Sequence, residues 1–190
     1  MKKELYKQLT DEIMYNNSKQ DTYTNYAYVI VAAVWSIAFS VQIEWLALVP
    51  LLVLIPICLR ISDCRYSIAF LASYIKIFLE PHLDAEWQTM HIKYYERHKR
   101  TLIQNILYHG SKLDIPFLSL ISCVIFWLLR GKEVIFSEFY LSLLILIVQF
   151  VIVVFDCLIC FKYSDISRVK KPLLKNWREL YDEKENERES

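Results

Sequence analysis

Long apolar runs alternate with charged segments along this chain. From Tyr26 to Leu59 the only charged residue is Glu44, close to a polar break near the centre of the run. One helix over the whole run would measure roughly 51 Å, well beyond the roughly 30 Å hydrocarbon core of a bilayer. The pattern therefore predicts two membrane-spanning helices, 25–41 and 45–59, with a turn between them at the opposite membrane surface.

A second pair of apolar runs, 113–129 and 138–161, is separated by a short polar turn that begins at Arg130. This spacing predicts a second helical hairpin. The chain is thus expected to be an all-α integral membrane protein. Its four transmembrane helices would form two hairpins, accompanied by cytoplasmic helices.

The segment between the two pairs predicts two more helices. The apolar stretch 66–79 contains Lys76 and is too short for a comfortable span, so a buried or interfacial helix is expected, with a re-entrant or spanning role as the alternative. Pro81 should end this helix. A longer helix is expected over 84–109, because Gly110 is a natural stop.

The tail predicts one further helix. Pro172 is expected to stand at its start, and a charged, disordered end is expected beyond Glu183. Its apolar residues recur at helical spacing, so this face needs a packing partner. The residues of the face are Leu173, Leu174, Trp177, Leu180 and Tyr181.

The distribution of Lys and Arg predicts the orientation. The first predicted turn has none of the 22, the second has only Arg130 and Lys132, and the other twenty lie outside the hairpins. Cytoplasmic loops retain positive charge, so a multi-pass protein of the inner (plasma) membrane with both termini in the cytoplasm is expected. Its segments would be a cytoplasmic N-terminal segment 1–24, transmembrane hairpin 1 over 25–59, a cytoplasmic helical segment 60–112, transmembrane hairpin 2 over 113–161 and a cytoplasmic tail 162–190.

Composition supports a membrane protein and adds few restrictions. Hydrophobic residues make up 55% of the chain, and a net charge of +1 predicts no overall attraction to nucleic acid. The five cysteines lie in or beside apolar runs and indicate no disulfide framework, and the Cys157–Cys160 pair is expected to pack within a span. No cleavable signal peptide is expected, because the first residues hold no apolar core.

The most specific feature is a polar stripe in the fourth predicted span. Ser142, Gln149 and Asp156 recur every seven residues and therefore project from one helix face. Polar groups in lipid are costly unless they face a bundle interior or water, so this face should avoid lipid. One interpretation is hydrogen bonding to another helix, with Asp156 near the cytoplasmic surface; the other is a pore-lining or gating face in an oligomer.

Two other spans carry weaker features. In the first, Ala32, Ser36 and Ser40 form a stripe of small residues that predicts a packing interface. In the second, Pro50 and Pro56 each remove a backbone hydrogen bond, which favours a kink or a mobile element, although proline is common in spans.

The central cytoplasmic helix interleaves cations with rings. Phosphate requires positive charge and bases require flat faces, so this pattern is typical of nucleotide or single-strand binding. Anionic lipid headgroups or an ordinary solvated face would use the same residues. The candidate ligand-binding residues are Trp87, His91, Lys93, Tyr94, Arg97, His98 and Arg100.

Enzyme motifs are weak, and no enzyme, cofactor or metal is expected. Gly110 and Gly131 are the only glycines, which excludes glycine-rich phosphate loops, and neither HExxH nor GxSxG occurs. His91 and His98 share a helix face without an evident acidic partner, so a structural or pH-responsive role is favoured over catalysis.

The stretch YIKIFLEPHLDAEW, over 74–87, is the most distinctive part of the sequence. With its two short-turn hairpins around a helical middle, the chain resembles the small multi-pass membrane effectors of bacterial anti-phage defence systems, among them the membrane effector of the Hailong system. The resemblance implies an oligomeric channel, opened or held closed by a nucleotide signal and able to depolarise the inner membrane. It implies no catalytic residues.

The leading hypothesis is therefore a ligand-controlled, oligomeric inner-membrane channel or pore-forming effector. Its expected partners are the bilayer and further copies of the chain. A nucleotide or oligonucleotide signal from a partner nucleotidyltransferase is a further expected partner, and so is an anionic lipid. The alternative is a non-conducting membrane scaffold that recruits a cytosolic partner through Leu173, Trp177 and Leu180. An unrecognised membrane enzyme that depends on His91 or His98 comes third.

Overall fold

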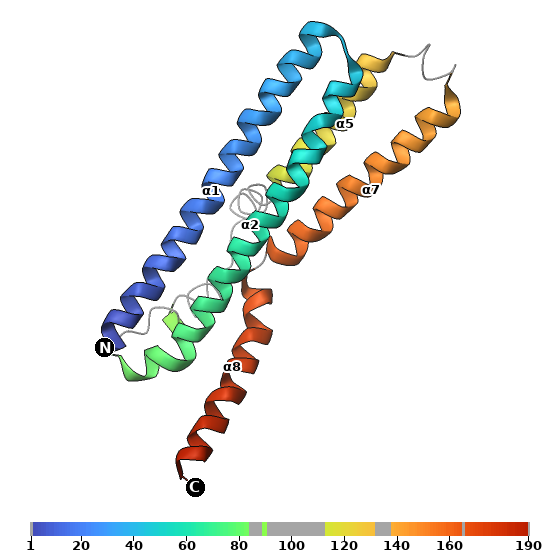
Figure 1. Ribbon diagram of the computed structural model, residues 1–190. Helices are drawn as coiled ribbons and strands as arrows, with labels where there is room; N and C mark the ends of the chain where they lie inside the picture. Colours follow the sequence, from blue (N-terminus) through green and yellow to red (C-terminus); the bar gives the residue numbers. More distant parts are fainter. Residues whose placement is uncertain (1, 84–88, 91–112, 132–137, 165, 190) are drawn as a thin grey trace. The chain divides into compact units, whose positions relative to one another are not determined.

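A computed structural model describes residues 2–83, 89–90, 113–131, 138–164 and 166–189. Every regular element in these ranges is a helix (Figure 1). In chain order these are the α-helix α1 (Lys2–Val41), the 3₁₀-helix η1 (Glu44–Leu48), α2 (Val49–Tyr74), the π-helix η2 (Ile75–Leu79), the 3₁₀-helix η3 (Glu80–His82), α5 (Asp114–Arg130), α7 (Phe139–Ser164) and α8 (Ile166–Glu189).

Three helical segments of the described chain are long and apolar enough to cross a membrane. They are Lys2–Val41, Glu44–His82 and Phe139–Tyr163. The helix over the third predicted span, α5, has 17 residues. An all-α chain with apolar, membrane-length helices is thereby confirmed, while the fourth span and the hairpin arrangement stay predictions.

The predicted break after the first span lies where expected. Helix α1 ends at Val41, and Gln42 has a φ of 56°, a left-handed conformation that stops the helix. The Gln42 side-chain amide donates a hydrogen bond to the Phe39 carbonyl at 2.6 Å. The chain then enters η1, which begins at Glu44.

The helices extend well past the predicted spans. Helix α1 begins at Lys2, and α2 continues to Tyr74 and leads directly into η2. The separate helix predicted for 66–79 is therefore wrong. No Gly or Pro interrupts the backbone between Pro56 and Pro81, so the change from apolar to polar side chains alters the surroundings of the helix without ending it.

The tail helix also differs from its prediction. Helix α8 begins at Ile166 and contains Pro172 in its interior, and it extends to Glu189. The charged end was expected to be disordered, and this is wrong. Its Glu, Lys and Arg residues are good helix formers, and Lys175 pairs with Glu179 one turn later at 3.8 Å.

The chain divides into two compact units. Unit 1 comprises Met1–Gln20, Asp63–Tyr108 and Tyr163–Ser190, and unit 2 comprises Asp21–Ser62 and His109–Lys162. The segment boundaries predicted from the charge pattern stay a prediction. The side of the membrane on which each unit lies stays a prediction.

Unit 2 has a core to which four helices contribute. Residues of α1, α2, α5 and α7 form one buried cluster, and a second, smaller cluster forms around Phe126. Many large apolar side chains of the same helices point outward and are exposed, as expected for lipid-facing surfaces. The main cluster consists of Ala27, Val31, Leu54, Cys58, Ile61, Ile115, Leu118 and Cys160.

The face of α1 that packs within the chain is not the small-residue stripe. Ala32, Ser36 and Ser40 are exposed, and both serine hydroxyls donate to carbonyls one turn earlier at 2.8 Å. The inner face instead presents Val31 and Trp35, whose indole nitrogen donates to the Ser122 hydroxyl at 3.2 Å. Packing of the stripe against another copy stays a prediction.

Unit 1 contains an aromatic cluster between the second half of α2, η2 and α8. The ring of Trp177 lies 5.0 Å from that of Phe70, 5.4 Å from that of Tyr74 and 5.7 Å from that of Phe78, centroid to centroid. Tyr181 lies 5.5 Å from Phe78. The apolar face of the tail thus has its packing partner within the chain.

Candidate functional site: a polar seam between α5 and α7

From Leu141 to Phe161, helix α7 is apolar except for one buried face. Ser142, Gln149 and Asp156 retain only 4%, 3% and 0% of their accessible surface. The neighbouring positions Phe150 and Val151 are exposed. The predicted stripe therefore does avoid the outer surface of the helix, and in a single copy it is covered by α5.

Gln149 is held by a tryptophan of α5. The Trp127 indole nitrogen donates to Gln149 Oε1 at 2.8 Å. The amide nitrogen Nε2 of Gln149 is buried and has no hydrogen-bond partner among the described residues. One half of this amide is therefore satisfied and the other half is available.

Asp156 is held by a serine of α5. The Ser119 hydroxyl donates to Asp156 Oδ2 at 2.6 Å, a short distance typical of a hydroxyl bound to a carboxylate. The second oxygen, Oδ1, is buried without a partner in the described part of the chain. A fully buried carboxyl group with one open acceptor is a strong attractor for a proton, a cation or water.

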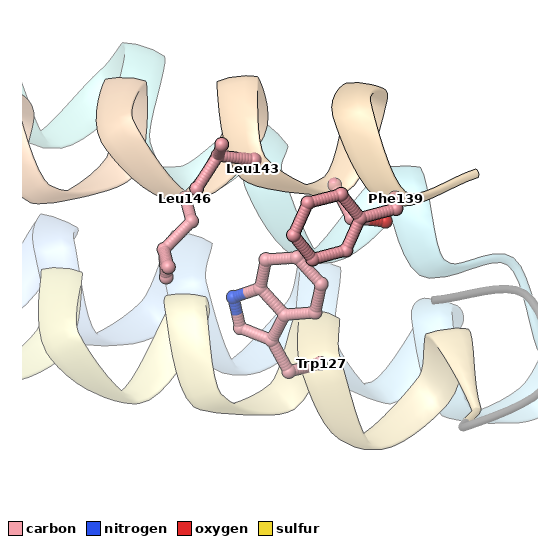
Figure 2. Close-up of a pocket in the computed structure, with 5 residues that line it drawn as sticks. Trp127, Phe139, Leu143 and Leu146 are labelled. Atoms are coloured by element: carbon pink, nitrogen blue, oxygen red, sulfur yellow. The ribbon is translucent and has the colours of Figure 1, made fainter. Parts of the chain in front are cut away.

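Ser142 lies beside a hollow between the two helices. A volume of about 260 Å³ is lined by this serine with Trp127, Phe139, Leu143 and Leu146. Figure 2 shows the Trp127 indole of α5 reaching toward the α7 side chains of Phe139, Leu143 and Leu146. The Ser142 hydroxyl is buried and finds no partner among the residues described.

A buried arginine closes one end of the seam. The Arg130 side chain is 1% exposed, and its guanidinium lies 2.7 Å from a Glu138 oxygen and 3.7 Å from a Glu44 oxygen. It also lies 5.5 Å from the Trp45 ring centroid and 5.6 Å from that of Phe126. From its place in the sequence, Arg130 was expected only to be a charge of the second turn.

The α5 side of the seam was missed as well. Ser119, Trp127 and Arg130 are eight and three residues apart, so these polar or amphipathic side chains follow one face of α5. That pattern was readable in the sequence. Which helix this face meets was not, because the pairing depends on how the helices are arranged in space.

The seven candidate ligand-binding residues lie outside the described residues. They are Trp87, His91, Lys93, Tyr94, Arg97, His98 and Arg100.

Among the described residues, no group of three or more His, Cys, Asp or Glu side chains is placed to hold a metal ion. The seam consists of hydroxyl, amide and carboxyl groups that follow one another between apolar helices. No protein-family model, curated protein or solved structure matches the chain.

Proposed function

We propose that this chain is a four-span inner-membrane protein that assembles in several copies into a ligand-controlled ion channel or pore. The observation that carries the proposal is the polar seam. Ser142, Gln149 and Asp156 each hold a buried polar atom without a partner among the described residues. Water or an ion that enters the seam would supply the missing interactions.

A buried polar group without a hydrogen bond costs roughly 1–3 kcal/mol in protein mutational data, and three lie on one face of a single helix. In a bilayer, such groups are expected along substrate or ion pathways. Gln149 and Asp156 are separated by about 10 Å along α7, so they could serve a permeating ion in succession.

The proposal takes α5 as the fourth span. Its 17 residues extend about 25 Å, at the lower limit for a transmembrane helix. Phe117, Leu120, Val124 and Leu128 are exposed on its outer side at 61%, 50%, 50% and 71%. Large apolar side chains along an outer helix face are expected to contact lipid.

Several copies are proposed because one chain encloses the seam too tightly. Direct hydrogen bonds from Trp127 and Ser119 join α5 to α7 within a single chain. For the stripe to line a pathway, α7 must separate from α5 and face equivalent helices of other copies. The closed chain described here is then the non-conducting state.

The cellular role rests on the resemblance alone. The architecture and the stretch 74–87 favour an effector that lowers the inner-membrane potential in anti-phage defence. A nucleotide or oligonucleotide signal would bind within 87–100 and control the pathway.

The test is ion flux in liposomes that contain the purified protein. Gln149→Leu and Asp156→Asn should each reduce flux about tenfold or more, because the first removes a polar side chain and the second removes the carboxyl group from the pathway. Val151→Ala is the matched control, since this side chain is 59% exposed on the opposite face. Absence of flux under every ligand condition, or unchanged flux in both seam variants, would refute the proposal.

The packing of the tail helix weakens the hypothesis of a non-conducting scaffold. The tail face was expected to need an external partner, yet Trp177 and Tyr181 pack on α2 and η2 in the same chain. Leu180 is 51% exposed and is the remaining apolar contact point of that hypothesis. Removal of the chain after Lys171 distinguishes the two, since it should abolish recruitment and leave a pore in place.

A further inference from the structure

A groove with a positively charged lining lies between η2 and α8 in unit 1. Its volume is about 330 Å³. Lys76 and Ile77 line it from η2, and Leu174, Lys175 and Arg178 line it from α8. Three of the five lining side chains are cations and none is acidic.

The cations of α8 lie on the same face of the helix because of their spacing. Leu174 and Lys175 come four and three residues, about one helical turn, before Arg178, so both lie beside it on one face. On the other side, Lys76 stands in a five-residue π-helix, a rare conformation that often marks functional positions. The two elements pack together, so their charged side chains are held near one another.

A fourth cation, Lys170, lies close enough to Lys76 to interact with it electrostatically. Lys170 is buried at 7% exposure, and its pKa is lowered to about 8 by burial first and by Lys76 second, with Glu80 acting in the opposite direction. A lysine whose proton is made less stable by a neighbouring lysine lies in a region of excess positive potential.

One lining cation of the groove, Lys175, has an acidic neighbour on its own helix. The one ion pair described there, Lys175 with Glu179 at 3.8 Å, joins side chains that are 79% and 60% exposed. Exposed pairs of this kind contribute little in water. Lys175 can therefore exchange Glu179 for a stronger anion.

We propose that the groove between η2 and α8 binds a phosphorylated anion. Arg178 offers a planar fork that matches two phosphate oxygens, and Lys76 and Lys175 supply point charges. Ile77 and Leu174 give an apolar floor for the carbon part of the ligand. The phosphate belongs either to an anionic lipid headgroup or to a soluble molecule, and the chemistry of the groove suits both.

This proposal is independent of ion conduction. It concerns η2 and α8, and it neither uses the seam residues nor includes the predicted ligand residues 87–100. A non-conducting protein could have this site.

The test titrates the full-length protein in neutral detergent with two probes. Pyrophosphate represents a soluble ligand and is measured by calorimetry. Phosphatidylglycerol represents an anionic lipid and is measured by native mass spectrometry, with zwitterionic phosphatidylcholine as the reference of zero net charge. Binding of pyrophosphate alone assigns a soluble ligand, and selective binding of phosphatidylglycerol alone assigns a lipid headgroup. Binding of both supports the shared phosphate chemistry.

The variant Lys76→Gln/Arg178→Gln should weaken binding of the active probe about tenfold or more, because charged hydrogen bonds are worth well over 1 kcal/mol each. Lys171→Gln/Lys184→Gln removes the same charge from exposed positions of α8 and should change affinity about twofold at most. Arg178→Lys keeps the charge but loses the planar fork, so its affinity should lie between those of the wild type and Arg178→Gln.

Two results would overturn the proposal. One is that pyrophosphate shows no binding in calorimetry and phosphatidylglycerol binds no more tightly than phosphatidylcholine in mass spectrometry. The other is that the control pair loses as much affinity as the groove pair, since that would show non-specific attraction to the charge of α8. An unchanged circular dichroism spectrum verifies that the groove variant is folded.

Discussion

Arg130 brings its charge into a buried position that only its partners make tolerable. Glu44 and Glu138, its two carboxylate partners, are 25% and 51% exposed, so each can be solvated without the arginine. The reverse does not hold, because the arginine side chain is 1% exposed. An uncompensated buried charge is strongly destabilising, whereas a neutral side chain of similar volume is often tolerated.

We therefore predict an asymmetry between the two ways of breaking this cluster. Glu44→Gln/Glu138→Gln should destabilise the protein by roughly 3–5 kcal/mol, and Arg130→Met by roughly 1–2 kcal/mol. Thermal unfolding in detergent, followed by tryptophan fluorescence, measures both. Asp182→Asn/Glu183→Gln removes two exposed carboxylates of α8 as the control. Equal losses from the two core variants would contradict the burial argument.

Asp156 and Ser119 should show coupling in a double-mutant cycle. Ser119→Ala leaves a fully buried carboxyl group without its hydroxyl donor and should cost roughly 1–3 kcal/mol. Ser119→Ala/Asp156→Leu removes both polar partners and should recover most of that stability. If the function proposed here is right, the double variant is stable and does not conduct. A stable double variant with normal flux would separate Asp156 from the pathway.

Lys170 predicts a specific pH dependence. Its folded pKa, about 8, lies below the ordinary value of 10.5, so between these pH values the unfolded chain binds the proton more tightly than the folded chain. Stability should rise with pH across this window, by roughly 3 kcal/mol at most, and should not vary with pH through this group below about pH 8, where both states hold the proton. Melting temperatures across the window should rise less in Lys170→Met than in the wild type, with Lys171→Met as control. Parallel curves would contradict the assignment.

At the scale of elements, the seven-residue recurrence was enough to find the buried face of α7, because helical geometry is local. The turn after α1 was predictable for the same reason, since Gln42 and Glu44 interrupt an apolar run. Helix ends were not predictable from hydropathy, because α2 continues from apolar into polar sequence without a backbone break. Contacts such as Trp127 with Gln149 require the register between helices, which a single sequence does not contain.

The packing of α2 against α7 can be tested by cross-linking. The Sγ atoms of Cys58 and Cys160 are 3.7 Å apart and belong to one buried cluster. Disulfide formation needs a sulfur separation of about 2 Å, a shift that side-chain rotation can supply. With Cys64, Cys123 and Cys157 replaced by Ser, copper-phenanthroline should produce an intramolecular disulfide detectable by intact mass. A variant with Cys160 alone is the control; failure to cross-link would place these helices apart.

At the scale of the whole molecule, the number of spans decides which surfaces face the cytoplasm. Three membrane-length helices are found in the described chain, and α5 is shorter by a small margin. Three spans would place the termini on opposite sides of the membrane, whereas four place them on the same side. The charge distribution favours four, because 20 of the 22 Lys and Arg residues then lie in the cytoplasm.

Single cysteines in a cysteine-free background can distinguish these arrangements with a membrane-impermeant maleimide. With four spans, Gln42→Cys and Lys132→Cys are labelled in intact cells, whereas Lys7→Cys and Lys184→Cys react only after permeabilisation. With α5 outside the membrane, Lys184→Cys would be labelled in intact cells and Lys132→Cys would be protected. That pattern would also remove α5 from the bilayer and, with it, the basis for an ion pathway along the polar seam.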